Sequence, residues 1–419
     1  MMNLKEATHY IEKRQNEVSS ESFFAFAKKT KLALSRPLIH VAGSNGKGCT
    51  CFYLALLASK KYGSRCGTLF NSFAGEANDA IWIGDQPLKE EEFLKKFEEH
   101  LPLYEKYNLT GYEILVDIAY RVFEEKELAL AIVECGMGAL GDPSLLDDLK
   151  TELAIITNVS LEHTEFLGTT LSEIALACSG VIAKKKPVLV GPIDEGCEEA
   201  LRSVCAKKKT SLSRLDRPHL PHLVGGTEFV FDYPPYKNIA IATTAFYEVG
   251  DAILALEANK ICPLLGLTEE EIREAWKGKN HPLHCERKGD FVFDVAENPA
   301  AIEMLCRSFP TLGRGKPVHV LFAAKDTANI SVMLPLLDDN AKTVVLTSFE
   351  GEGARDEMGF ALYTEDHEYI ENPLMALMNL SMRFPGETIL ITGNRVFVTP
   401  LWRTVGKRKK TSRRLMNRC

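Results

Sequence analysis

The chain has 419 residues, which is too long for one average domain, so two or three domains are expected. A formal net charge of −7 argues against general nucleic-acid binding, and 45% hydrophobic residues suffice for large cores. No run reaches the roughly 18 apolar residues of a membrane span, and the charged first residues lack the apolar centre of a signal peptide. The 11 cysteines are scattered without a CxxC pair, which predicts reduced thiols and a cytoplasmic protein without a membrane partner.

Short apolar runs alternate with helical patterns through the first two thirds of the chain. Strands are predicted at Pro37–Gly43, 65–72, 128–136, 152–160 and 186–191. Helices are predicted at 49–63, 89–107, 113–126 and Leu171–Ala183. This order of elements is typical of an α/β fold with a doubly wound, mostly parallel sheet that is covered by helices.

The last third has a separate organisation. A region from about Asp216 to Tyr236, rich in proline and glycine, precedes two helical stretches around Ala242–Ala258 and Glu269–Lys277, and Lys277–Asp290 is predicted to be a linker. Strand and helix patterns then alternate again, which predicts a smaller Rossmann-like α/β domain. We expect domains at 1–283 and 284–406, followed by a basic tail at 407–419. A flexible solvated end is favoured for this tail over a nucleic-acid-binding arm.

The stretch HVAGSNGKGCT, which begins at His40, joins a predicted strand to a predicted helix through a glycine-rich turn. Gly43, Gly46 and Gly48 would let the backbone approach an anion closely, and Lys47 would place its ammonium beside nucleotide phosphates. The turn departs from the strict GxxxxGK[ST] pattern because Gly48 follows the lysine. A tight connection without a ligand is the alternative, but the lysine and the following helix favour a nucleotide site. The residues assigned to the nucleotide here are Gly43, Ser44, Asn45, Gly46, Lys47, Gly48, Cys49 and Thr50.

The loop GSNGKGCT resembles the GTNGKGST loop of folylpolyglutamate synthases, which form the two-domain branch of the Mur ligase superfamily. Further stretches follow in the family's order: GYEILVDIAYRVF, AIVECGMG, AIITNVSLEHTEFLG, SGVIAKKKPVLVG, FDVAENPAA and ILITGN. The loop begins at Gly43, which leaves no room for the additional first domain of the three-domain Mur ligases. The resemblance implies a nucleotide-binding domain of the Mur ligase central type and a smaller C-terminal ligase domain.

The resemblance also implies a reaction and its cofactors. Family members join L-glutamate to a folate or dihydropteroate carboxylate with ATP, through an acyl phosphate, and use Mg²⁺, which Mn²⁺ could replace. Lys47, Glu134 and His163 match the family's catalytic positions, and Ser72, Glu134 and His163 match its metal site. Asn158 matches an asparagine that orients the site. Family members are generally monomers, and the expected partners are small molecules only.

For most of these residues a structural role is the alternative. A buried Glu134 without a catalytic role would need an ion-pair partner. His163 and Ser72 could be ordinary structural or solvated side chains. Asp294 and Asn298, in DVAENP, match positions that would contact the nucleotide, but they could instead cap the helix that begins near Pro299.

Several family positions carry other residue types in this chain. Cys49 stands where a hydroxyl residue should hold Mg²⁺, and a thiol is a poor ligand for that hard ion. The remaining departures each remove a cationic or metal-supporting group: Leu140 and His284 for arginines, Cys178 for a lysine and Glu297 for a histidine, while Asp142 is kept. Because Lys47, Glu134 and His163 remain, the leading hypothesis is an active glutamate ligase. A weak or inactive nucleotide-binding paralogue and a ligase for a different carboxylate are the alternatives.

Overall fold

The computed structural model describes residues 2–14, 20–215, 222–224 and 226–416, and it divides into two compact units. The first unit contains Met1–His219, Asp232–Ile239 and Gly250–Lys277. The second contains Leu220–Phe231, Ala240–Val249 and Gly278–Cys419. No helix in the described ranges is long and apolar enough to cross a membrane.

The first unit is built on an eight-stranded sheet in the order β4-β3-β2-β5-β1-β6-β7-β8. The strands from β2 to β8 in this order run parallel, whereas β3 and β4 pair antiparallel at one edge. The strands are β1 (Pro37–Ala42), β2 (Cys66–Leu69), β3 (Ile81–Ile83), β4 (Gln86–Pro87), β5 (Leu130–Glu134), β6 (Lys150–Ile156), β7 (Val188–Val190) and β8 (Leu212–Arg214).

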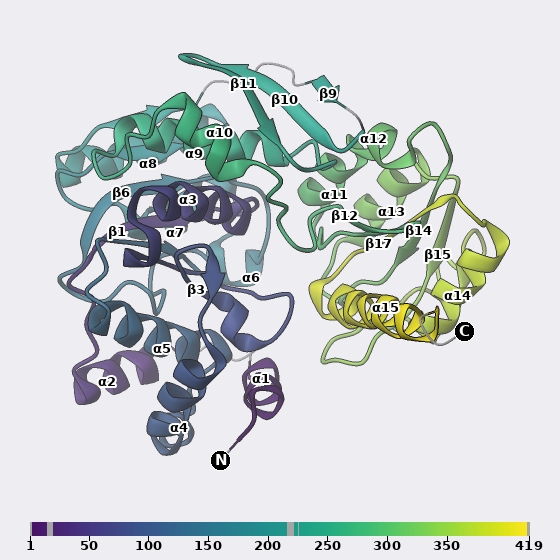
Figure 1. The fold of residues 1–419 in the computed structure, drawn as a ribbon, viewed down its shortest axis with the longest axis horizontal. Coiled ribbons are helices and arrows are strands. Elements are labelled where there is room, and N and C mark those ends of the chain that lie inside the picture. The colour runs from purple at the N-terminus through teal and green to yellow at the C-terminus, as the bar shows by residue number, and fades with distance from the viewer. Residues whose placement is uncertain (1, 15–19, 216–221, 225, 417–419) are drawn as a thin grey trace. The chain divides into compact units, whose positions relative to one another are not determined.

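Helices cover both faces of this sheet, with α3 on one side and α4 and α5 on the other (Figure 1). Several begin at a threonine whose side chain and a glutamate three residues later bond each other's backbone amides, as Thr110 and Glu113 do at α5. The helices are α1 (Leu4–Glu12), α2 (Ser20–Thr30), α3 (Lys47–Tyr62), α4 (Glu90–Lys106), α5 (Gly111–Glu125), α6 (Thr164–Leu167), α7 (Leu171–Cys178), α8 (Glu195–Lys208), α9 (Glu248–Ile261) and α10 (Glu269–Trp276).

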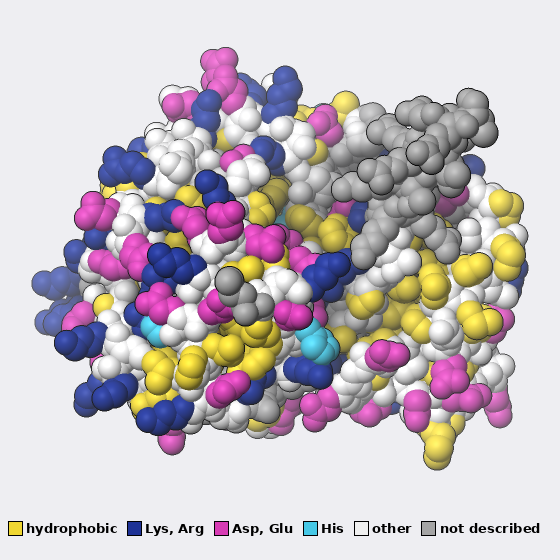
Figure 2. Space-filling model, turned by 60° about the horizontal axis from the view of Figure 1, so that its bottom comes forward, with side chains coloured by type: hydrophobic (Ala, Val, Ile, Leu, Met, Phe, Trp, Pro, Cys, Tyr) yellow, Lys and Arg dark blue, Asp and Glu magenta, His cyan; other side chains and the backbone are white. Residues whose placement is uncertain are grey.

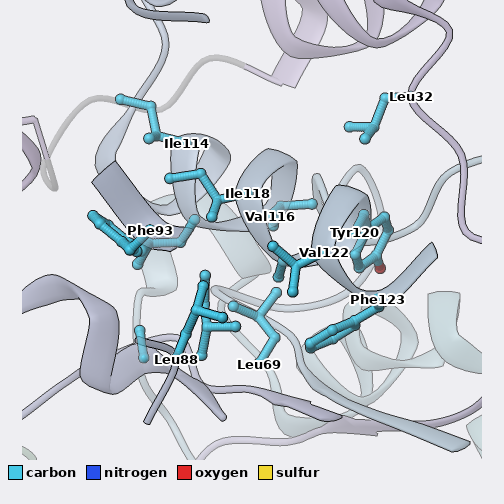
Figure 3. Close-up of a cluster of buried hydrophobic side chains, with 14 of the residues drawn as sticks. Leu32, Leu69, Leu88, Phe93, Ile114, Val116, Ile118, Tyr120, Val122 and Phe123 are labelled. Atoms are coloured by element: carbon cyan, nitrogen blue, oxygen red, sulfur yellow. The ribbon is translucent and has the colours of Figure 1, made fainter. Parts of the chain in front are cut away.

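One core cluster lies between α5 and the sheet and is shown in Figure 3. Ile114 and Ile118 of α5 are fully buried together with Phe93 of α4 and Leu69 of β2. Each such side chain stabilises the fold by about 1.5–3 kcal/mol through removal of apolar surface from water. The cluster therefore holds the strands whose carboxyl ends carry the candidate site.

The second unit has a six-stranded sheet in the order β12-β13-β17-β14-β15-β16, in which only β12 runs antiparallel to its neighbour. In Figure 1, α11 and α13 lie on one side of these strands and α15 on the other. The elements are β12 (Glu286–Lys288), β13 (Phe291–Phe293), α11 (Pro299–Cys306), α12 (Phe309–Gly313), β14 (Val318–Phe322), α13 (Ile330–Asp338), β15 (Thr343–Leu346), β16 (Glu368–Tyr369), α14 (Pro373–Arg383), β17 (Thr388–Thr392) and α15 (Arg395–Met416).

The predicted α/β architecture is confirmed, but several element boundaries differ. The helix expected over Leu171–Ala183 ends at Cys178 and continues as a 3₁₀ turn at Ser179–Val181. A side chain at Gly180 would lie only 2.7 Å from the Ala139 backbone, so this turn packs directly against a loop. The helix expected at Ala242–Ala258 begins only at Glu248.

The proline-rich region is more regular than expected. It contributes β9 (His222–Val224) and β10 (Glu228–Tyr233), which join β11 (Tyr236–Ile241) in a three-stranded sheet. Residues 216–221 and 225 of this region lie outside the described residues. The basic segment after residue 406 has helical backbone as far as Met416. Lys or Arg and Asp or Glu side chains are interspersed on the face shown in Figure 2.

Candidate functional site

A glycine loop, residues 43–48, connects β1 to α3 at the carboxyl end of the first unit's sheet. The chain leaves β1 toward β2 and leaves the adjacent β6 toward β7, so the loop lies where parallel α/β sheets bind their ligands. Gly43 and Gly46 have φ angles of +129° and +79°, which side chains other than glycine rarely adopt. A side chain at Gly43 would also lie 2.2 Å from the Thr157 Oγ1.

The segment after β6 fixes the shape of this loop. The Ser44 N–H donates to the Asn158 carbonyl at 3.0 Å, and the Asn45 N–H donates to the Asn158 Oδ1 at 3.0 Å. The Asn158 Nδ2 and the Thr157 Oγ1 donate in turn to the Asn45 carbonyl, at 2.8 Å and 2.6 Å. These four hydrogen bonds, three of which involve Asn158, join the loop to the end of β6.

Lys47 is the first residue of α3 and folds back over the loop. Its Nζ donates to the Gly43 carbonyl at 2.8 Å and to the Ser44 carbonyl at 2.9 Å. Burial acts to lower the pKa of Lys47, but the negative charges of Glu162 and Glu134 outweigh it and the pKa is raised. An ammonium has three donors, so one N–H remains for an anion.

Glu134 ends β5 beside the loop and is buried, with 6% of its surface exposed. Its Oε2 accepts the Asn71 N–H at 2.9 Å and lies 3.4 Å from the position of a side chain at Gly48. Ser72 follows Asn71 directly and is half-buried. The structure therefore brings the segment of Ser72 and the Glu134 carboxylate to the start of α3.

His163 lies in the loop after β6, exposed, and has left-handed backbone with φ of +45°. Among the described residues, no three His, Cys, Asp or Glu side chains converge on one point. Mg²⁺ is commonly held by one or two carboxylates together with substrate phosphates and water. The buried Glu134 carboxylate beside the glycine loop fits that pattern.

Cys49 and Thr50 follow the loop in the first turn of α3, and both side chains are buried. Cys49 is 1% exposed, and its thiol hydrogen-bonds the Asp251 carboxyl of α9. Thr50 is fully buried, and its Oγ1 has no hydrogen-bond partner among the described residues. The thiol at position 49 thus has an internal partner in Asp251.

Two more residues of the first unit differ from the family's residue types: Cys178, close to the glycine loop, and Leu140, at the surface. Burial raises the pKa of the Cys178 thiol to about 11, against the lowering effects of Lys47 and of the Gly43 backbone. Cys178 therefore lies beside the lysine of the loop. Leu140 is 66% exposed and points away from any core.

A buried polar network that the sequence did not reveal lies beneath the loop. The His40 ring of β1 contacts the Ser144 Oγ through Nε2 at 2.9 Å, and Ser144 bonds the Asp142 Oδ1 through its hydroxyl and its N–H. The Asp142 Oδ2 accepts the Gly136 N–H at 2.7 Å. Burial raises the pKa of Asp142 to about 6, although these hydrogen bonds act to lower it. This network fixes the turn after β5 relative to β1.

The assigned residues of the second unit make contacts within that unit. The buried Asp294 accepts hydrogen bonds from the Tyr247 hydroxyl at 2.5 Å, the Cys285 N–H at 3.1 Å and the Ala296 N–H at 2.9 Å. The Asn298 Oδ1 accepts the Ala301 N–H at 2.9 Å, so Asn298 is the N-cap of α11, as the structural alternative predicted.

His284 and Glu297 also have partners in the second unit. The His284 ring stacks on the His281 ring with centroids 3.9 Å apart, and its Nδ1 lies 2.8 Å from the Pro282 carbonyl. Burial lowers the pKa of His284 to about 4. The Asn394 Nδ2 donates to the Glu297 Oε2 at 2.9 Å.

Two residues near the loop were missed by the sequence analysis. Glu162 acts on Lys47 by its charge, and Asp251 lies against Gly46. Asp251 is one of few acidic residues in the otherwise apolar run EVGDAILAL, and such a break in an apolar helix face is the signal that could have pointed to it. With backbone amides at the start of a helix and a lysine beside them, the first unit can bind phosphate groups and neutralise their charge. The nearby Glu134 carboxylate can hold a cation that adds to this neutralisation.

Comparison with known families and proteins agrees with this geometry. Residues 41–217 match the Mur ligase middle domain. The dihydrofolate synthase/folylpolyglutamate synthase of Buchnera aphidicola is 30% identical over 322 residues, which cover 74% of this chain and 75% of that protein. The folylpolyglutamate synthase of Lacticaseibacillus casei is 24% identical over 392 residues, or 88% and 89% of the two chains.

Solved structures show the same fold. Mycobacterium tuberculosis folylpolyglutamate synthase complexed with ADP superposes with a TM-score of 0.84 at 20% identity, over 96% of this chain and 98% of that chain. A bifunctional folylpolyglutamate synthase/dihydrofolate synthase with Mn, AMPPNP and L-glutamate bound gives 0.81 at 21%, over 97% and 98%. From the extent of these matches and the residues of the loop, we conclude that the chain belongs to the folylpolyglutamate synthase and dihydrofolate synthase family.

Proposed function

We propose that this protein uses ATP to join L-glutamate to the carboxylate of a folate or of dihydropteroate, and releases ADP and phosphate. The observation that carries the proposal is the glycine loop with Lys47 and Glu134 beside it, in a chain of the synthase family. The relatives supply the substrates, since they are named as folylpolyglutamate and dihydrofolate synthases.

The chemistry proceeds in two steps. The substrate carboxylate attacks the γ-phosphorus of ATP, which forms an acyl phosphate and ADP. The amine of L-glutamate then attacks the acyl carbon, an amide bond forms and phosphate leaves. Both steps depend on neutralisation of phosphate charge, which removal of one donor typically weakens by orders of magnitude in rate.

The glycine loop serves the first of these steps. The N–H groups at the start of α3 would face the phosphates of a bound nucleotide, and the third N–H of the Lys47 ammonium would contact the β and γ phosphates. Asn158 and Thr157 keep the loop open for the nucleotide through their bonds to Asn45. We assign Lys47 as a catalytic residue and residues 43–50 as nucleotide-binding.

A divalent cation, Mg²⁺ or Mn²⁺, would be held by Glu134 with Ser72 and His163, and would supply charge neutralisation on the transferring phosphoryl group. Glu134 is positioned for this by the Asn71 N–H and lies next to the loop. The assignment of Asp294 and Asn298 to the nucleotide stays a prediction, as do the domains 1–283 and 284–406, the basic tail at 407–419 and a monomeric state.

The test is ADP release by the full-length protein with Mg²⁺–ATP, L-glutamate, and either tetrahydrofolate or dihydropteroate. Release that depends on one of these acceptors identifies the carboxylate substrate. Lys47→Ala is expected to lower the rate by about 100-fold or more, since it removes a charge from the phosphoryl group. Lys60→Ala is the matched control, because Lys60 lies at the other end of α3 in a surface ion pair with Glu274.

The paralogue without ligase activity is the second candidate, and Cys178 beside Lys47 is the observation that favours it. ATP binding without turnover on either acceptor would contradict the ligase and support this candidate. Equal rates for Lys47→Ala and Lys60→Ala would contradict the assignment of the glycine loop.

A further inference from the structure

An acidic residue lies against the glycine loop although it is about 200 positions away in the sequence. Asp251, in the first turn of α9, has 8% of its surface exposed. A side chain built at Gly46 would lie 2.2 Å from the Asp251 Oδ1 and 2.9 Å from its Cγ. The carboxyl group therefore occupies the space directly over the middle glycine of the loop.

The Asp251 carboxyl has a donor on the opposite element. Cys49, in the first turn of α3, hydrogen-bonds the carboxyl through its thiol. Burial raises the pKa of Asp251 to about 7, and the Cys49 thiol acts in the opposite direction. Among the described residues, Cys49 of α3 is thus the titratable side chain that acts on this carboxyl, and the loop presents the uncharged Gly46 to it.

A carboxyl in this place affects phosphate binding through its charge. The N–H groups of the loop create a positive potential that favours a bound anion. A carboxylate next to them already interacts with this potential and repels the phosphate. In a buried site this repulsion is screened less than at a surface. The protonated acid has no such effect and packs on Gly46 as a neutral group.

We infer that Asp251 is a positioning residue of the glycine loop: as the neutral acid it supports Gly46 and Cys49 for nucleotide binding, and as the carboxylate it weakens that binding. This rests on the proposed nucleotide site. It also gives Cys49 a role, because a thiol is a weak donor that stabilises the carboxylate only slightly.

The experiment is titration calorimetry of Mg²⁺–ADP into the full-length protein from about pH 6 to about pH 8.5. For the natural sequence, Kd is expected to rise about tenfold as Asp251 ionises, beyond any change that the nucleotide itself contributes. Asp251→Asn, which stays neutral, is expected to bind with a Kd that lacks this rise. Glu199→Gln, which removes an exposed charge on α8, controls for net charge and should follow the natural sequence.

Cys49→Ala provides a second test that does not depend on the folding of Asp251→Asn. Without its thiol donor the pKa of Asp251 rises further, so the midpoint of the loss in affinity is expected to move to higher pH. Cys49→Ser keeps a donor and should not show this upward move.

The outcomes separate the two proposals. If no variant binds Mg²⁺–ADP at any pH, the proposed nucleotide site is wrong and this inference falls with it. If the natural sequence binds but Asp251→Asn shows the same dependence on pH, the role of Asp251 is overturned while the nucleotide site stands. A midpoint that stays fixed in Cys49→Ala overturns the role of the thiol.

Discussion

The glycine loop of the first unit and the DVAENP segment of the second both resemble stretches of the family's sequence, but their contacts differ in kind. In the loop, hydrogen bonds from residues 157–160 fix the backbone. Lys47 donates to two loop carbonyls, which leaves its third N–H without an acceptor among the described residues. In DVAENP, the acceptors of Asp294 and Asn298 bond donors of their own unit.

This difference shows that residues in a matching motif can either shape a binding surface or stabilise the fold. The loop residues shape a surface that receives an anion, so their substitution should affect binding first. The residues of DVAENP hold a strand end and a helix start together, so their substitution should affect folding first. The two regions also differ in a nearby buried group whose pKa is shifted. Beside the glycine loop this group is the Asp251 carboxyl, and beside DVAENP it is the pair of imidazoles of His281 and His284.

The largest expected effect is that of Asp294→Ala on stability. It leaves the Tyr247 hydroxyl and the Cys285 and Ala296 amides without their acceptor, and a buried unsatisfied donor costs about 1–3 kcal/mol. The free energy of unfolding, measured in urea, should fall by about 3–5 kcal/mol. Asp290→Ala, at an exposed position just before β13, should change it by less than about 0.5 kcal/mol. Equal effects would remove the distinction between the two regions.

Gly46→Ala should cause the next largest loss in the free energy of unfolding, and it should also abolish nucleotide binding. The new side chain requires left-handed backbone, which costs about 1–2 kcal/mol, and it clashes with the Asp251 carboxyl. Gly266→Ala is the matched control, since Gly266 has φ of +71° and nothing within 4 Å. The unfolding free energies should differ by about 1–3 kcal/mol, the cost of overpacking. A control that loses as much stability would contradict the contact with Asp251.

The two regions should depend on pH with opposite signs. The folded pKa of Asp251, about 7, is raised above its ordinary value of 3.8, so the stability linked to it is lost as pH rises toward 7. The folded pKa of His284, about 4, is lowered from 6.5, so the stability linked to it is lost as pH falls below 6.5. Each effect reaches at most about 1.4 kcal/mol per pH unit.

Urea unfolding from about pH 5 to pH 8 checks this prediction. Asp251→Asn should gain stability relative to the natural sequence toward pH 8, and His284→Asn should gain toward pH 5. Gains at the same end of the pH range for both variants would contradict the opposite pH dependence of the two regions.

The smallest effect is expected for Asn298→Ala, which removes the N-cap of α11. Loss of such a cap costs about 1 kcal/mol. Asn298→Asp retains an acceptor for the Ala301 N–H and should keep the stability. If Asn298→Asp also leaves the Kd for Mg²⁺–ADP unchanged while Asn298→Ala raises it, the residue affects the nucleotide only through the helix.

Much of the fold could be predicted because its signals are local. The alternation of apolar strands and amphipathic helices predicted the parallel sheets, and β1, α3 and β5 lie close to their expected positions. The loop was predictable because glycines with positive φ and a following helix are local features. The three-stranded sheet of β9, β10 and β11 was missed, since proline and glycine suggested irregular backbone there.

The sequence by itself determined the family, the glycine loop and the residue types available to it. Only the tertiary structure decided what those side chains contact: Cys49 bonds Asp251, Lys47 bonds carbonyls of its own loop, and Asn298 caps a helix. The physical reason is that a buried polar group must find a partner wherever the fold places one. Asp251 meets Gly46 across about 200 residues of chain, and such a contact arises from the packing of α9 against the loop rather than from any local pattern.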